Sequence, residues 1–87
     1  MLKINGKVLA PNGLTARLST QLVAEANKYN SSLILTVDGE SADLKSIMNV
    51  MALVIPNGLE YEISLNGNDE EIAYEHFIKL LKEIELL

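Results

Sequence analysis

The chain has 87 residues, a formal net charge of −5 and no cysteine. A domain of this length buries about 60 % of the surface that its unfolded chain exposes, and the 48 % hydrophobic content is enough for one core. The lack of cysteine excludes disulfides, thiolate metal sites and a cysteine nucleophile. The basic residues are few and scattered, which argues against direct nucleic-acid binding, since that requires clustered Lys and Arg.

No stretch approaches the roughly 20 apolar residues of a membrane-spanning helix, and the first residues lack the apolar region of a secretion signal. We therefore expect a cytoplasmic protein without membrane insertion, folded as a single domain over residues 1–87.

The first half of the chain predicts a strand, a helix and a hairpin. Alternating residues of one parity indicate a strand with one buried face over the first ten residues: Leu2, Ile4, Gly6, Val8 and Ala10. A helix from Thr15 or Ala16 to about Lys28 is predicted by the helical spacing of Leu18, Leu22, Val23 and Ala26. A strand over 33–37 then reaches Asp38-Gly39, a hairpin signal that leads into a short strand around 40–42.

The second half predicts a helix, a strand and a helix. The second helix begins near Lys45, with Ser46 at its cap, and its apolar positions are Ile47, Val50, Met51 and Val54. Strict alternation over 59–65 indicates a strand with one solvated face. A third helix follows a cap at Asn68 or Asp69, with its apolar stripe at Ala73, Phe77, Leu80, Leu81 and Ile84. The order βαββαβα predicts an α+β fold of two layers with the helices on one side.

The turn before the first helix is the first candidate site. Asn12-Gly13 is a turn signal, and Thr15 follows as a possible helix cap. A loop of this kind leaves backbone N–H groups free at the helix start, which makes a potential anion cradle.

Two segments resemble the signature segments of HPr, the small phosphocarrier of the bacterial sugar phosphotransferase system. They are Gly13-Leu14-Thr15-Ala16-Arg17 and Lys45-Ser46-Ile47-Met48, and the resemblance extends over nearly the whole chain. It implies an HPr-like open-faced two-layer sandwich, with a four-stranded antiparallel sheet in the order 1-4-2-3 and three helices on one face.

In that family the first segment reads Gly-Leu-His-Ala-Arg-Pro, and its histidine accepts the phosphoryl group. This chain has Thr15 at that position, and a threonine phosphoester would have to expel an alkoxide to pass its phosphate on. We therefore expect no catalytic residue there. Thr15 is interpreted as a plain helix cap in preference to a regulatory phosphothreonine.

Ser46 keeps its family surroundings, and in relatives this serine is the target of HPr kinase/phosphorylase. A phosphate at a helix N-cap meets free N–H groups and the positive end of the helix dipole, so it can be accommodated there. An unmodified cap is the alternative, and the motif favours phosphorylation.

The resemblance also implies a protein-docking surface around both segments. The candidate docking residues are Arg17, Thr20, Gln21, Lys45, Ile47, Met48 and Met51. A simpler alternative places Ile47 and Met51 in the core.

No other cluster suggests chemistry. His76 is the sole histidine and lacks companions for a metal site. The acids of 69–75 suit a solvated first helical turn. We expect no enzyme, no cofactor and no metal.

These observations lead to a non-carrier, HPr-like regulatory protein of carbon catabolite control, similar to the Crh (catabolite repression HPr) branch and switched at Ser46. The partners implied by the resemblance are HPr kinase/phosphorylase and a catabolite control transcription factor. One alternative is a constitutive interaction module without phosphorylation. A further alternative is a phosphocarrier component of the phosphotransferase system.

Overall fold

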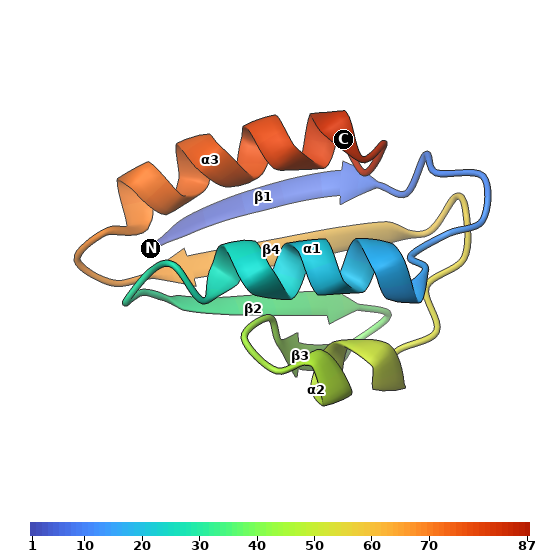
Figure 1. Cartoon of the computed structure of the whole chain (residues 1–87), viewed down its shortest axis with the longest axis horizontal. Coiled ribbons are helices and arrows are strands. Elements are labelled where there is room, and N and C mark those ends of the chain that lie inside the picture. The colour runs from blue at the N-terminus through green and yellow to red at the C-terminus, as the bar shows by residue number, and fades with distance from the viewer.

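The chain forms one four-stranded sheet with three helices packed on it (Figure 1). The computed structural model describes all of residues 1–87. The elements are β1 (Leu2–Lys7), α1 (Ala16–Ala26), β2 (Ser32–Val37), β3 (Glu40–Asp43), α2 (Ile47–Ala52), β4 (Glu60–Asn66) and α3 (Glu70–Glu83). The strand order is β1-β4-β2-β3, and all neighbouring strands are antiparallel. The predicted topology and strand order are confirmed.

The alternation of β4 explains why the helices gather on one side of the sheet. Tyr61, Ile63 and Leu65 are buried, whereas Glu60 is exposed and Glu62 is half-buried. Ile63 lies between Ile4 of β1 and Leu35 of β2, so the apolar side chains of three strands form one continuous surface.

The helices α1 and α3 cover this surface with most of the stripe that their sequences predict, whereas α2 contributes a single residue of its predicted stripe. The buried helical residues are Leu18, Ser19, Leu22 and Ala26 of α1, Val50 of α2, and Ala73, Phe77 and Leu81 of α3. In Figure 1, α3 runs along β1, α1 runs along the strands over β4 and β2, and α2 lies beside β3. The helix α2 therefore contributes one fully buried side chain and leaves most of its surface free.

Several predicted boundaries are wrong. Strand β1 ends at Lys7 instead of Ala10, although Val8 and Ala10 are buried as expected. Helix α2 ends at Ala52, so Val54 lies beyond it and is 87 % exposed. Leu53 already has the extended ψ of 135°, and Pro56 further on cannot continue a helix. The stripe predicted for the second helix reduces to Val50.

The start of α3 also differs from its prediction. Asp69 is the N-cap residue, but its side chain makes no cap hydrogen bond. Its carboxylate accepts instead from the backbone N–H groups of Asn30 (2.8 Å) and Ser31 (2.9 Å) and from the Ser31 hydroxyl. Asp69 thereby joins α3 to the loop between α1 and β2.

No helix has the length and apolar content needed to cross a bilayer.

Candidate functional site

The loop that leads into α1 is fixed by close backbone contact with the loop before β4. Gly13 has φ +72°, and a Cβ atom there would lie 2.4 Å from the carbonyl oxygen of Ile55. The next residue, Leu14, donates its N–H to the same carbonyl over 2.8 Å. Only glycine allows this conformation and this approach together.

Two further contacts hold the loop, and neither is visible in a sequence pattern. The side-chain amide of Asn57 lies within 3.1–3.4 Å of the carbonyl oxygens of Val8, Leu9 and Ala10. The N–H of Leu9 donates to the carbonyl of Glu85 at 2.9 Å, which ties the loop to the end of α3. Both contacts join residues far apart in the chain, so local spacing gives no signal for them.

Thr15 caps α1 as predicted. Its Oγ1 accepts a hydrogen bond from the N–H of Leu18 at 3.3 Å, and its φ and ψ of −76° and 168° are the extended values of an N-cap residue. The hydroxyl oxygen therefore satisfies one of the free N–H groups at the helix start.

A surface hollow of about 410 Å³ opens beside this cap. Its polar lining comes from Asn12, Thr15, Arg17, Gln21, Glu83 and Glu85. Arg17 is exposed and forms no ion pair within 4.0 Å, so its guanidinium is free to bind an incoming carboxylate or phosphate. The two glutamates come from the end of α3 and were not predicted as part of the site, because the fold brings them there.

The second predicted segment begins α2. Ser46 has extended φ and ψ of −113° and 112°, and its Oγ accepts from the N–H of Asn49 at 3.2 Å, as predicted for a cap. Lys45, a predicted docking residue, is half-buried, and its Nζ donates to the carbonyl of Tyr29 at 2.7 Å. The side-chain amide of Asn27 donates to the Lys45 carbonyl at 3.1 Å. Ser46 is therefore attached to the end of α1 through its neighbour.

The predicted docking residues are distributed over α1, α2 and the segment between them. Met48 and Met51 are exposed and Ile47 is half-buried, so the alternative that placed Met51 in the core is wrong. We call these three residues the α2 patch. Thr20 and Gln21 are exposed on α1, which packs against α2. Of this set, only Arg17 and Gln21 line the hollow.

His76 joins a polar cluster between α1 and α3. Its Nδ1 lies 2.5 Å from the hydroxyl of Tyr29, which donates to Glu25 at 2.6 Å. Burial, and then the Glu25 carboxylate, raise the pKa of Tyr29. Burial alone would raise the pKa of Glu25, but hydrogen bonds from Tyr29 and Lys28 outweigh it and lower that pKa. No group of three or more His, Asp or Glu side chains is placed to hold a metal ion.

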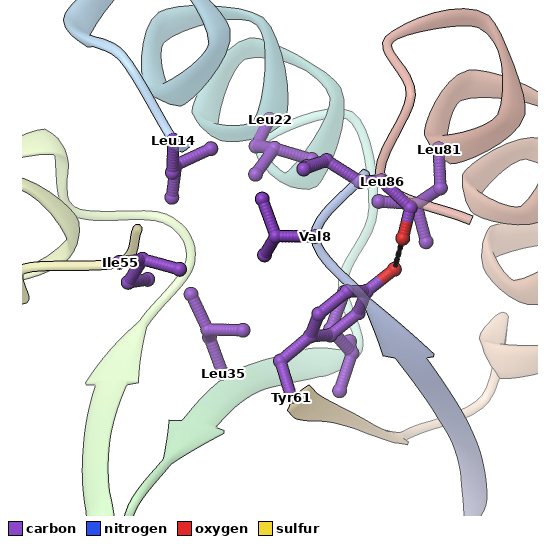
Figure 2. A pocket seen from close by; sticks show the side chains of 9 residues that line it. Val8, Leu14, Leu22, Leu35, Ile55, Tyr61, Leu81 and Leu86 are labelled. Carbon is purple, nitrogen blue, oxygen red and sulfur yellow. Dashed lines mark hydrogen bonds between the residues drawn. The ribbon is translucent and has the colours of Figure 1, made fainter. Parts of the chain in front are cut away.

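An apolar cavity lies inside the protein between the sheet, α1 and α3 (Figure 2). Nine hydrophobic residues line it, among them Val8, Leu14, Leu22, Tyr61 and Leu86. Its volume of about 10 Å³ is at the lower limit for one water molecule, and its walls offer such a molecule no polar lining. It is a packing gap and not a ligand site.

The fold and the two capped helix starts define an open-faced β-sandwich with a polar hollow at the beginning of its first helix. The family model described as the PTS HPr component phosphorylation site matches residues 3–83. The chain therefore belongs to the HPr family.

Relatives of this chain are phosphocarrier proteins by name. The phosphocarrier protein HPr of Haemophilus influenzae is 35 % identical over 79 residues, which cover 91 % of this chain and 93 % of that protein. That of Lysinibacillus sphaericus is 37 % identical over 79 residues, with coverage of 91 % and 90 %.

Solved structures include both phosphocarriers and a catabolite repression protein. The Mycoplasma histidine-containing phosphocarrier protein has a TM-score of 0.94 at 32 % identity, covering 99 % of this chain and 98 % of its own. The Bacillus subtilis catabolite repression protein Crh, described as a dimer with a swapped domain, has a TM-score of 0.74 at 34 % identity, with coverage of 100 % and 99 %. This chain is similar to both.

Proposed function

We propose that this HPr-family protein is a cytoplasmic regulator of carbon catabolite control that docks on other proteins, is switched by phosphorylation of Ser46 and does not carry phosphoryl groups. The observation that carries the proposal is Thr15. Thr15 is the N-cap residue of α1, and its hydroxyl oxygen accepts a hydrogen bond from the N–H of Leu18. By family resemblance, this is the position of the acceptor histidine.

The sole histidine is poorly placed to replace that acceptor. His76 contacts Tyr29, which follows the C-terminal end of α1, whereas Thr15 lies at the N-terminal end. The eleven residues of α1 separate these ends by about 16 Å at 1.5 Å per residue. A partner protein that delivers phosphate to the hollow beside Thr15 would not reach the imidazole of His76 in the same pose.

Ser46 supports the regulatory half of the proposal. A phosphate on its Oγ would lie at the start of α2, where backbone N–H groups and the helix dipole favour negative charge. Met48 and Met51 are exposed within the next five residues, so a partner that contacts Ser46 meets apolar side chains beside it. The partners proposed by family resemblance are HPr kinase/phosphorylase and a catabolite control transcription factor.

Incubation with HPr kinase/phosphorylase and ATP, followed by intact mass measurement, tests this proposal. We expect one added phosphoryl group on the wild type and on Ser32→Ala, an exposed serine outside the motif, and none on Ser46→Ala. An unmodified wild type would refute phosphorylation at Ser46. Partner capture of equal strength by unmodified and phosphorylated protein would favour a constitutive interaction module.

The phosphocarrier function is the second candidate, and the names of the curated relatives favour it. It predicts labelling by phosphoenolpyruvate and enzyme I. We expect no label on the wild type and label on Thr15→His, in which the imidazole stands beside Arg17 in the same hollow. Labelling of the wild type would support this candidate over the regulatory one.

A further inference from the structure

Two of the chain's three methionines lie on the exposed side of α2. Met48 is 80 % exposed and Met51 is 54 % exposed. Their spacing of three residues places both side chains on one side of the helix, and the burial of Val50 fixes which side faces the core. The third methionine, Met1, is 69 % exposed at the start of the chain, just before β1.

These thioethers are the only oxidisable sulfur atoms of the chain, which has no cysteine. A peroxide converts a thioether into a sulfoxide: the sulfur gains one oxygen and loses two electrons, and hydrogen peroxide is reduced to water. Because both sulfur atoms of α2 belong to exposed side chains, the oxidant can reach them without unfolding the protein. The product is polar where the thioether was apolar.

We propose that Met48 and Met51 form a peroxide-sensitive modification site that weakens protein docking at the α2 patch. The switching half of this inference rests on the proposed docking function. Met48 follows Ser46 by two residues, so a protein that covers the Ser46 hydroxyl also covers the first thioether. A sulfoxide buried in that contact is a strong acceptor without a partner, which disfavours binding.

The fold should tolerate both sulfoxides. Val50 is the only fully buried residue of α2, and the cap contact between Ser46 and Asn49 uses no methionine atom. Any loss of docking after oxidation would therefore come from the surface and not from unfolding.

Peptide mass mapping after treatment with hydrogen peroxide tests the site without a partner protein. We expect Met48 and Met51 to be oxidised at rates within about threefold of the rate of exposed Met1. The circular dichroism and the amide NMR spectrum of the oxidised protein should remain those of a folded protein. If Met48 and Met51 remain thioethers when Met1 is fully oxidised, the assignment is overturned.

The phosphorylation of Ser46 by HPr kinase/phosphorylase, measured after removal of peroxide, tests the switch. We expect the KM for the oxidised wild type to rise at least about tenfold, equivalent to about 1.4 kcal/mol of lost binding. The double variant Met48→Leu, Met51→Leu keeps apolar side chains of similar volume but has no oxidisable sulfur in α2. Whatever KM this variant has before treatment, peroxide should leave that value unchanged.

An unchanged KM after oxidation of the wild type, or an equal rise in the leucine variant, would overturn the switch. If the unoxidised wild type accepts no phosphate, the proposed function fails and the switch with it. The peptide masses then still decide whether Met48 and Met51 are the oxidised residues.

Discussion

The hydroxyl of Tyr61 donates a hydrogen bond to the backbone carbonyl of Leu86, which ties the last residues to an inner strand of the sheet (Figure 2). Tyr61 and Leu86 are both buried. The neighbouring carbonyl, that of Glu85, accepts from Leu9. The segment after α3 is therefore hydrogen-bonded both to the core, through Tyr61, and to the loop that leads to Thr15, through Leu9.

Removing this hydroxyl should destabilise the protein and change its behaviour in alkali. Tyr61→Phe leaves a buried carbonyl without its donor, which should cost about 1–2 kcal/mol in urea unfolding. Burial raises the pKa of Tyr61 from 10.0 to about 12. The unfolded chain thus loses this proton first, and wild-type stability should fall as pH rises from 10 to 12.

The control for that experiment is Tyr74→Phe, a half-buried tyrosine whose hydroxyl makes no hydrogen bond in the protein. It should keep both the stability and the alkaline slope, whereas Tyr61→Phe should lose part of the slope. Identical slopes in Tyr61→Phe and the wild type would contradict the role given to burial of Tyr61.

A second prediction concerns Gly13 in the loop before α1. Gly13→Ala combines a positive φ with a Cβ atom 2.4 Å from the Ile55 carbonyl, so it should destabilise by about 2–4 kcal/mol. Gly39→Ala has a similar φ of +80° but meets nothing within 4 Å, so it should lose only about 1–2 kcal/mol. Equal losses in thermal unfolding would show that the close approach at Gly13 contributes nothing.

The end of α3 offers a stabilising substitution. Glu85 has φ +61°. The N–H of Glu85 donates to the carbonyl of Lys82 and the N–H of Leu86 to the carbonyl of Leu81, which is the pattern of a Schellman motif. Glycine suits that conformation, so Glu85→Gly should stabilise by about 0.5–1 kcal/mol. Lys79→Gly, at an exposed position in the interior of the same helix, should destabilise by a similar amount. A loss of stability in Glu85→Gly would contradict this account.

Acid should weaken the link made by Asp69. The Ser31 hydroxyl and the Asn30 N–H lower the pKa of Asp69 below its ordinary 3.8. The unfolded chain therefore takes up this proton first, and the contribution of Asp69 is present above pH 3.8 and disappears as pH falls below it. Asp69→Asn should flatten the acid side of the stability profile, measured by urea unfolding. Glu71→Gln, an exposed residue of the same helical turn, should leave that side unchanged.

The sequence predicted the order of the elements and, outside α2, most of their buried residues, because both depend on neighbours in the chain. The alternation of β4, the stripe of α1 and the caps at Thr15 and Ser46 each involve residues at most a few positions apart. The strand order came from the family resemblance, since alternation alone says nothing about which strands pair.

Contacts between distant segments could not be predicted, because local spacing in the sequence carries no signal for them. The sequence predicts that Asp69 or Asn68 caps α3. In the fold, the Asp69 carboxylate accepts hydrogen bonds from the backbone N–H groups of Asn30 and Ser31 instead. Glu83 and Glu85 reach the hollow beside Thr15 only through the tertiary structure. The same holds for the Asn57 amide at the loop carbonyls and for the contact of Tyr29 with His76, which lies 47 residues further along the chain. The end of α2 was placed too late because apolar Val54 fitted the helical spacing while remaining exposed.

The most direct test of the account is to expose the wild-type protein separately to ATP with HPr kinase/phosphorylase and to phosphoenolpyruvate with enzyme I, and to locate any phosphate by peptide fragmentation. We predict an acid-stable phosphate on Ser46 from the first donor and no phosphate from the second. Acid-labile phosphate from the second donor, or an unmodified Ser46 after the first, would contradict a regulatory protein that carries no phosphoryl groups.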